Sequence, residues 1–196
     1  MKAAIVFHSV SGNNLEIAKT FQQALVKLKV ETDLFRVEDN DLNKWVEMYP
    51  IVDKYRGKIE AVPVANAVAM KGYDLVVLGS PTYYGDVSGE MKAFMDSCAP
   101  LWQNADLFGK ILFAWTTAAS EEGGGHICLK SIVNFGMHMG MIYVPVPSNL
   151  LQGAFPAYGL IHYCSETGDK RIDGRMSEGI NKMAKILKSI ASKLLL

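Results

Sequence analysis

Three short runs of this 196-residue chain are apolar at every position, and they limit the folds open to it. Residues 3–7, 75–79 and 111–115 show no alternation between apolar and polar side chains. Strands of that composition are buried on both faces, which is typical of a parallel sheet covered by helices on each side. A fourth run at 141–146 is also apolar and includes a proline that would end it. We therefore expect these runs to be the central strands of an α/β domain.

Amphipathic segments separate these strands, which is the spacing expected of alternating strands and helices. Apolar residues recur at helical intervals in four segments, which begin near Leu15, Ser88, Cys128 and Ile180. A more polar run at 31–37 alternates and suits a second, more exposed strand. The pattern predicts a single doubly wound domain over residues 1–196, with five parallel strands in the order 2-1-3-4-5.

The segment 38–72 is the least regular part of the chain. Apolar residues from 42 to 49 have helical spacing, and Pro50 is expected to end that helix. Residues 56–58 are expected to form a polar turn, and residues 64–70 a second short helix. We interpret the whole segment as a helical crossover with a surface loop.

Composition excludes several classes of function. The chain has 20 basic and 20 acidic residues, so no large electrostatic field draws it to nucleic acid or to a membrane surface. No apolar run is long enough to cross a bilayer, and the first one is too short for a signal-peptide core. Three widely separated cysteines suit reduced thiols, and no spacing of His, Cys and carboxylates suggests a metal site. We therefore expect a soluble cytoplasmic protein without a metal.

An uncharged loop follows the first strand. Residues 9–14 hold two hydroxyls, one glycine and two amides, with no acidic or basic side chain. Such a loop can wrap backbone N–H groups around a phosphate at the N-terminus of the next helix. The same residue types fill ordinary turns, so the loop alone is a weak signal. It matches neither the Rossmann glycine pattern nor the P-loop with its lysine.

Two further unusual loops follow the third and fourth expected strands. Residues 81–86 include two tyrosines, which suit contact with a flat aromatic ligand, and residues 116–126 include three consecutive glycines. In doubly wound sheets ligands bind at the carboxyl ends of strands, where the strand order reverses. The three loops would then surround one crevice, which suits a mononucleotide with a large ring.

Several of these segments resemble known flavoproteins. Residues 9–14 resemble the flavodoxin phosphate loop, with Asn14 in place of the usual Thr. Residues 79–96, G-S-P-T-Y-Y-G-D-V-S-G-E-M-K-A-F-M-D, are closer to the pattern of the WrbA-type NAD(P)H:quinone oxidoreductases. Further matches to that family are Leu101-Trp102, the glycines at 123–125, His138 with 140–145, and Pro156 with Tyr158 and Gly159. The resemblance covers nearly the whole chain and implies a flavodoxin-like fold.

This resemblance implies that FMN binds in the crevice. The residues implied for its phosphate are Ser9, Val10, Ser11, Gly12, Asn13 and Asn14. Those implied for its isoalloxazine ring are Pro81, Thr82, Tyr83, Tyr84, Gly85 and Asp86. Those implied for the pyrimidine edge or the ribityl chain are Thr116, Thr117, Ala118, Gly123 and Gly124.

The family also implies a reaction and an assembly. NAD(P)H would give a hydride to the flavin and leave before a quinone takes both electrons, so the protein itself supplies no nucleophile. The residues considered for substrate contact are Trp102, His126, His138 and Met139. Trp102 would lie at a subunit contact of a homodimer or homotetramer, or else in the core. Tyr83 and Met139 depart from the family pattern, which commonly has Arg and His there.

Two other classes of protein remain open on the sequence alone. One is a flavodoxin-type electron carrier, although such carriers are usually strongly acidic and this chain is neutral. The other is a binding or regulatory module that has the same fold and no flavin.

Overall fold

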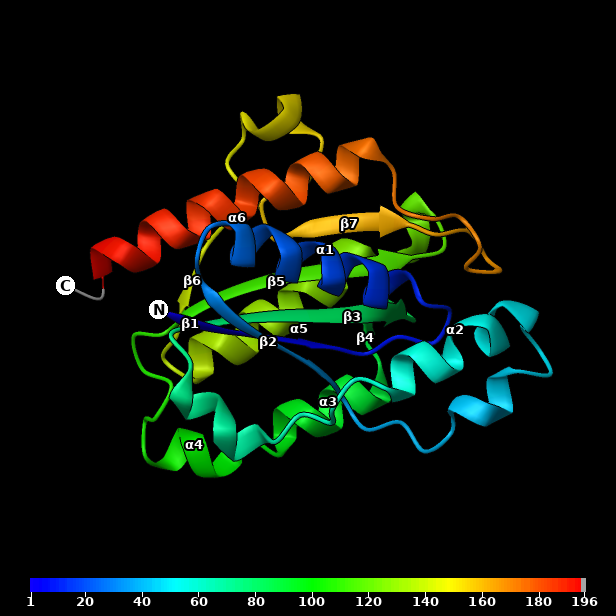
Figure 1. The fold of residues 1–196 in the computed structure, drawn as a ribbon, viewed down its shortest axis with the longest axis horizontal. Coiled ribbons are helices and arrows are strands. Elements are labelled where there is room, and N and C mark those ends of the chain that lie inside the picture. The colour runs from blue at the N-terminus through cyan, green and yellow to red at the C-terminus, as the bar shows by residue number, and fades with distance from the viewer. Residues whose placement is uncertain (195–196) are drawn as a thin grey trace.

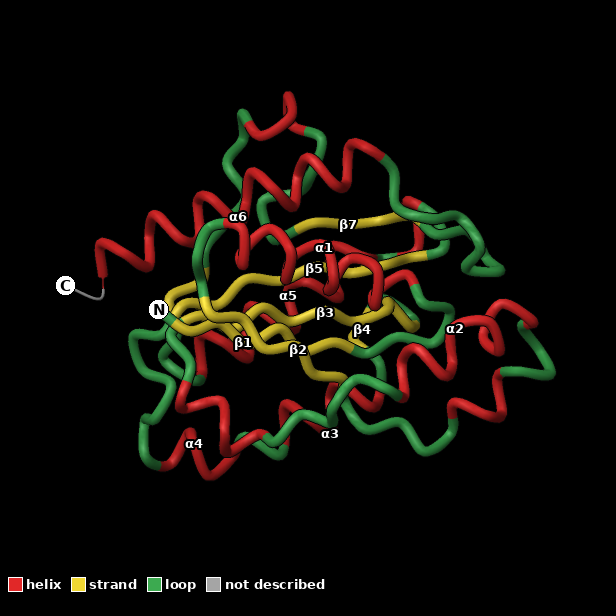
Figure 2. The backbone as a smooth tube through the Cα atoms, in the orientation of Figure 1, coloured by secondary structure: helices red, strands yellow, loops and turns green. Residues whose placement is uncertain are grey.

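The computed structural model describes residues 1–194, and its centre is a parallel sheet with helices on both faces (Figure 1, Figure 2). The parallel strands are β1 (Lys2–Phe7), β2 (Glu31–Arg36), β3 (Leu75–Tyr83), β5 (Ile111–Ala118), β6 (Ile142–Tyr143) and β7 (Leu160–Tyr163). The sheet runs in the order β2-β1-β3-β5-β6, which confirms the predicted doubly wound α/β fold and its strand order. A two-residue strand, β4 (Asp86–Val87), pairs antiparallel with the end of β3.

Two layers of helices cover this sheet. The helices are α1 (Asn13–Lys27), α2 (Pro50–Glu60), α3 (Gly89–Asp96), α4 (Ala99–Gln103), α5 (Gly125–His138) and α6 (Gly174–Leu194), with 3-10 turns η1 (Leu42–Trp45), η2 (Ala67–Gly72), η3 (Glu121–Gly123) and η4 (Leu150–Gly153). One hydrophobic cluster contains residues of α1, α2 and α6, and the other contains residues of α3, α4 and α5. Ile5 and Phe7 of β1 belong to the first cluster, whereas Ala4 and Val6 belong to the second. Both faces of the strand are thus buried, which explains its uninterrupted apolar sequence.

The last position of the sheet is shared by two short strands. β6 pairs with Ile111 and Leu112 at the start of β5, and β7 pairs with residues 115–118 at its end. The sequence had predicted one strand over 141–146, which is wrong in extent. Pro145 and Pro147 cannot donate hydrogen bonds to a sheet, so the chain leaves it after Tyr143 and returns at Leu160.

The segment between β2 and β3 also differs from the prediction. Pro50 begins α2 rather than ending a helix, because proline suits the first position of a helix, where its missing N–H costs no hydrogen bond. The expected turn at 56–58 lies inside α2, and the expected helix at 42–49 is reduced to η1. The second expected helix is the 3-10 turn η2, in which the side chain of Asn66 accepts from the backbone N–H of Val68 at 3.0 Å.

The loops that follow β1, β3 and β5 lie together at one edge of the sheet. This carboxyl edge is on the right of Figure 1, where α2 and the segment after β7 also lie. Among residues 1–194, no helix is long and apolar enough to cross a membrane.

Candidate functional site

A cavity of about 700 Å³ lies at the carboxyl edge of the sheet. It falls within the size range of small-molecule sites. Five segments line it: the loop after β1 (Ser9, Val10, Ser11, Asn14), the region from η1 to α2 (Trp45, Met48, Tyr49, Val52), the end of β3 (Pro81, Thr82, Tyr83, Tyr84), the end of β5 (Thr117, Ala118, Ala119) and residues 164–168 after β7. The three loops identified from sequence therefore do meet at one crevice.

The loop after β1 turns sharply at Gly12. This residue has a φ of 87°, in the left-handed region that side chains with a Cβ disfavour, and it immediately precedes α1. A Cβ atom at this position would lie 2.3 Å from the ring of Tyr55. Glycine is thus required here both by backbone conformation and by the aromatic ring packed against it.

The same loop presents unused hydrogen-bond donors. Within the described part of the chain, the backbone N–H groups of residues 9–12 donate no hydrogen bond. The side-chain oxygen of Ser9 is buried and has no partner among these residues. Because buried polar groups are normally paired, this set of free donors at the N-terminus of α1 points to an anionic ligand.

Hydrogen bonds fix the two asparagines of the loop. The indole N–H of Trp115 donates to Oδ1 of Asn14 at 2.9 Å, and Trp115 is fully buried. Nδ2 of Asn13 donates to the carbonyl of Gly168 at 2.7 Å. Asn14 still lines the cavity, but Asn13 does not and instead ties the loop to the segment after β7. The side chain of Asn13 is thus engaged outside the cavity wall, and contact of this residue with a phosphate stays a prediction.

Aromatic side chains after β3 form another part of the cavity wall. Tyr84 is fully exposed, with a φ of 52°, and Tyr83 is 37% exposed. Desolvation of the partly exposed Tyr83 phenol by its neighbours, together with the charges of Glu90 and Asp39, raises its pKa above the ordinary value. The phenol of Tyr83 therefore keeps its proton at neutral pH and can act only as a neutral hydrogen-bond donor or acceptor.

The end of β5 forms a third wall. Thr117 and Ala118 line the cavity as expected, whereas Thr116 is buried and donates to the carbonyl of Ser80 at 2.7 Å. Gly124 lies against the turn at Gly85, since a Cβ on Gly124 would come within 2.9 Å of the Gly85 Cα. Besides Asn13, six predicted contacts do not line the cavity: Gly12, Gly85, Asp86, Thr116, Gly123 and Gly124. These residues shape the loops rather than the cavity wall.

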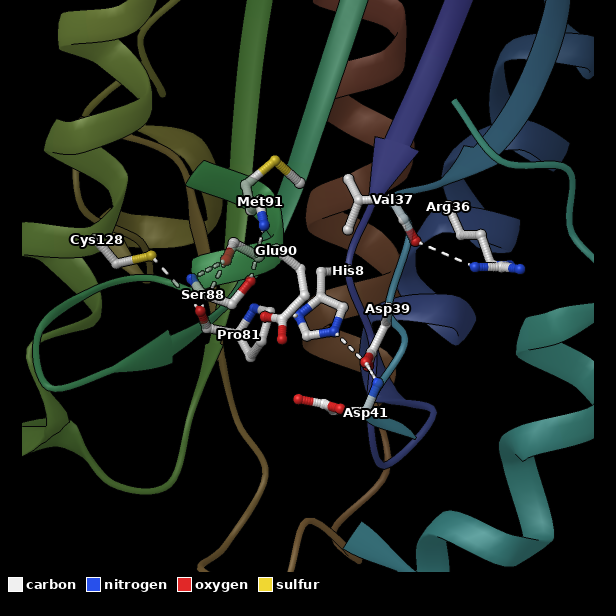
Figure 3. Close-up of polar contacts among 11 residues, drawn as sticks. His8, Arg36, Val37, Asp39, Asp41, Pro81, Ser88, Glu90, Met91 and Cys128 are labelled. Carbon is white, nitrogen blue, oxygen red and sulfur yellow. Dashed lines mark hydrogen bonds and ion pairs between the residues drawn. The ribbon is translucent and has the colours of Figure 1, made fainter. Parts of the chain in front are cut away.

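A buried histidine lies directly before the loop after β1. Figure 3 shows the imidazole of His8 between two carboxylates, with Nε2 at 3.0 Å from Asp39 and Nδ1 at 3.6 Å from Glu90. Burial raises the pKa of the Asp39 carboxyl, but the hydrogen bonds from His8 and from the backbone N–H of Asp41 outweigh it and hold the pKa below its ordinary value. His8 thus connects the end of β1 to α3 and to the segment that supplies Trp45 and Tyr49.

Comparison with known proteins identifies the family. The profile of the NADPH-dependent FMN reductase family matches residues 1–155. The chain belongs to this family.

Individual relatives agree with the match. A protein of Archaeoglobus fulgidus named NAD(P)H dehydrogenase (quinone) is 31% identical over 143 residues, which cover 73% of this chain and 75% of that protein. A protein of the same name from Gluconacetobacter diazotrophicus is 23% identical over 202 aligned positions and covers 98% of both chains. Among solved structures, a WrbA-like flavodoxin from Agrobacterium tumefaciens superposes with a TM-score of 0.69 at 16% identity, over 98% of both chains. Flavodoxin 1 from Bacillus cereus gives 0.66 at 15% identity, over 96% of this chain and 98% of that one.

Membership of the NADPH-dependent FMN reductase family makes FMN the cofactor of this chain, and the cavity suits it. The free N–H groups and the unpaired hydroxyl of Ser9 match a terminal phosphate. The tyrosines at the other end match a flat ring system. No lysine or arginine lines the cavity, so its phosphate end offers neutral donors only.

Sequence reasoning missed two parts of the cavity wall. The first comprises Trp45, Met48, Tyr49 and Val52, which come from the segment whose structure was also predicted least well. The second is residues 164–168, which are carried to the site by the unforeseen strand β7. Only the helical spacing of the first group, with its two aromatic residues, could have indicated a role at the site.

The four residues considered for substrate contact lie outside the cavity of this chain. His126 is exposed in the first turn of α5. His138 and Met139 are at the other end of α5, which is about 20 Å long by its residue count. Gly140 accepts from the N–H of Gly109 just before β5 begins, which places this end at the amino edge of the sheet. Trp102 is exposed on α4. None of the four thus lines the cavity of its own chain, and their contact with substrate stays a prediction, which for Trp102 concerns a subunit contact near the flavin of a neighbouring subunit.

Proposed function

We propose that this protein takes a hydride from NADH or NADPH and passes both electrons to a quinone-like acceptor in a two-step reaction. FMN supplies the chemistry, because it can accept a hydride and release electrons to a second substrate. The residues of the chain would bind the cofactor, orient it and leave one face of its ring open. The observation that carries the proposal is the cavity wall, in which a single lining residue has a charged side chain.

Among the residues that line the cavity, Glu166 is the one with a charged side chain. Its other lining residues are hydroxyl, amide, small, aliphatic and aromatic residues, including Tyr49, Tyr83 and Tyr84. A neutral quinone and a nicotinamide ring can both stack on such surfaces without a cost for desolvating a charge. The names of the relatives from Archaeoglobus fulgidus and Gluconacetobacter diazotrophicus support the same substrates.

The side chains at the site divide into binding and proton-holding groups. Ser9, Ser11 and Asn14, with the N–H groups of the loop, would hold the phosphate, and Pro81 to Tyr84 would contact the ring. Tyr83 keeps a proton on its phenol oxygen and can donate it in a hydrogen bond to an acceptor oxygen. Cys164 also lines the cavity, but burial raises the pKa of its thiol above the ordinary value, so it is not a thiolate nucleophile.

A flavodoxin-type electron carrier is the second candidate. The superposition on flavodoxin 1 from Bacillus cereus is nearly as good as that on the WrbA-like protein, so the fold does not separate the two functions. The formal net charge of zero argues against the carrier, because such carriers are usually strongly acidic and this chain has no excess of acidic residues for docking to a basic partner.

An anaerobic experiment separates these two functions. The FMN-loaded protein is mixed with NADH or NADPH, the flavin absorbance is followed, and benzoquinone is then added. The proposal expects rapid bleaching and then full recovery of the absorbance on addition of the quinone. Failure of both nicotinamides to bleach a flavin that dithionite does reduce would contradict it and favour the carrier.

We also propose that the protein is a homodimer or homotetramer. Trp102, Phe108 and Met137 are 59%, 76% and 67% exposed, and all three lie near the amino edge of the sheet. Large exposed apolar side chains that occur together are typical of protein contacts. Light scattering at micromolar concentration is expected to give a mass of two or four chains, and a monomer would contradict this proposal.

The cysteines support a reducing compartment such as the cytoplasm. Cys98 and Cys128 are buried, Cys164 is partly buried, and all three are free thiols. Thiols of this kind persist where disulfides do not form.

A further inference from the structure

The loop after β1 has no basic residue of its own, but an arginine from the far end of the chain binds its backbone. Nη1 of Arg171 donates to the carbonyl of Ser11 at 3.1 Å. Nη2 of the same guanidinium donates to the carbonyl of Gly168, which also accepts from Asn13, and Nε donates to the carbonyl of Asp169 at 3.1 Å. One side chain therefore joins the segment after β7 to the loop after β1.

The guanidinium is also fixed in orientation. Its central carbon lies 4.8 Å from the centre of the Tyr55 ring, and Nη1 is 3.7 Å from Glu16. The hydroxyl of Tyr55 in turn donates to Glu16 at 2.8 Å, and the same ring packs against Gly12. Arg171 is about three-quarters buried, with 26% of its side chain exposed. Neither Arg171 nor Tyr55 lines the cavity, whereas Ser11 and Gly168, whose carbonyls Arg171 binds, do.

The contact with Ser11 determines where a donor of the loop points. The carbonyl of Ser11 and the N–H of Gly12 belong to one peptide bond, and in a trans peptide these two groups point in opposite directions. Holding the carbonyl against Arg171 therefore turns the N–H of Gly12 away from Arg171, a residue that does not itself line the cavity. In the described part of the chain this N–H has no other partner.

We propose that Arg171 is a positioning residue for the FMN phosphate: it holds the loop after β1 in the conformation that binds the phosphate, and so makes FMN bind more tightly than riboflavin. The residue acts through the backbone and does not touch the phosphate. Its forked guanidinium is needed because three carbonyls must be bound at once while the planar group stacks on Tyr55, which a lysine ammonium cannot do.

The test measures binding of FMN and of riboflavin to the apoprotein by quenching of flavin fluorescence. Arg171→Met keeps an unbranched side chain about as long as the aliphatic part of arginine but removes the charge and every donor of the guanidinium. We expect its dissociation constant for FMN to rise about 10- to 100-fold, as for the loss of hydrogen bonds that involve a charged group. Its constant for riboflavin is expected to change less than about threefold, because riboflavin has no phosphate to be held.

Arg175→Met is the matched control. Arg175 lies four residues further along the chain, stacks on Phe155 at 5.3 Å, and donates to the carbonyl of Ala154, so it has the same kinds of contact with a different segment. Both dissociation constants of this variant are expected to stay within about twofold of the wild-type values. Equal losses for FMN and riboflavin in Arg171→Met, or no loss for FMN, would overturn the proposal.

A second variant separates charge from geometry. Arg171→Lys keeps the positive charge, so full FMN affinity in this variant would show that only the charge matters and would contradict the positioning role. An FMN affinity close to that of Arg171→Met would support it. The ³¹P chemical shift of bound FMN adds a readout at the phosphate itself and is expected to move in Arg171→Lys but not in Arg175→Met. Because no nicotinamide or quinone is present, these outcomes do not depend on the proposed reaction.

Discussion

The two ends of the cavity are built in different ways. At the phosphate end, Gly12 is fixed by its backbone conformation, Asn14 by Trp115, and Asn13 by the carbonyl of Gly168. At the ring end, Tyr84 is fully exposed and Met48 is 63% exposed. A preformed end binds its ligand without a cost for ordering the protein, whereas exposed side chains can move aside for a second molecule. The comparison suggests that cofactor affinity is set at the phosphate end and substrate exchange at the ring end.

The largest expected effect tests the rigidity of the phosphate end. Gly12→Val places a branched side chain at a φ of 87° and against the ring of Tyr55. The left-handed conformation alone costs about 1–2 kcal/mol, and displacement of Tyr55 adds to it. We expect the dissociation constant for FMN to rise at least about 100-fold. Titration of the apoprotein measures this, and Asn14→Thr is expected to have a much smaller effect. Equal affinities of the two variants would contradict a phosphate site here.

A smaller effect, on stability, is expected from loss of the hydrogen bond between Asn14 in the loop and Trp115 in the core. Asn14→Val removes the acceptor of the buried Trp115 N–H, and an unpaired buried donor costs about 1–3 kcal/mol of stability. Asn14→Thr has the same shape as the valine variant but retains an oxygen. Urea unfolding is expected to show Asn14→Val as the less stable of the two by about that amount. Identical unfolding curves would mean that Trp115 finds another partner and that the loop is held more loosely than described.

A third prediction concerns pH. Burial lowers the pKa of His162 below the ordinary value of 6.5, although its hydrogen bond to the carbonyl of Lys170 opposes this. A lowered pKa means that the folded state disfavours the charged form, so its stability is complete above pH 6.5 and falls as the pH drops below 6.5 toward the folded pKa. His162 and Lys170 flank residues 164–168, so FMN is expected to bind a few-fold more weakly at pH 5.5 than at pH 7.5.

His162→Gln provides the control for that prediction. Glutamine can still donate to the carbonyl of Lys170 but does not titrate, so the difference in FMN affinity between pH 5.5 and 7.5 is expected to shrink. If the two proteins show the same pH dependence, another group is responsible.

The smallest effect on the cofactor is expected at the ring end. Tyr84→Asn removes an exposed aromatic ring and places a residue that tolerates the left-handed conformation at a φ of 52°. We expect the dissociation constant for FMN to change less than about twofold and stability to rise by about 0.5–1 kcal/mol. The Michaelis constant for benzoquinone is expected to rise. A loss of FMN affinity comparable to that of Gly12→Val would remove the distinction between the two ends.

Sequence reasoning succeeded where one local pattern determines the outcome. The double burial of β1, β3 and β5 follows from their composition, and the strand order followed from the doubly wound arrangement of those strands. The loops at 9–14 and 81–84 face the cavity because they directly follow those strands. The position of Pro50 was misjudged because proline ends one helix and begins another equally well, and only the packing of Val52, Tyr55 and Ile59 decides between them.

The remaining parts of the site depend on contacts between distant segments. Arg171 and Ser11 are 160 positions apart, and Trp115 and Asn14 are 101 apart. Neither pair leaves a signal in a local window of sequence. Gly85 and Gly124 pack against each other, although the sequence predicts both as ligand contacts. Close approach of two backbone segments and close approach of a ligand both require glycine, so the sequence alone does not distinguish the two roles.

Two short strands, β6 and β7, share the edge of the sheet that lies away from β2, and this affects how the sheet can pair with other molecules. β6 and β7 are two and four residues long, and they occupy different halves of one border of the sheet. A border that is interrupted in this way presents no long row of free backbone groups for another strand to join. The other border, β2, carries Glu31, Asp33 and Arg36, and charged side chains discourage the same kind of joining. Both edges of the sheet are thereby protected against pairing with other chains. This protection matters because the three central strands have the apolar composition that favours aggregation.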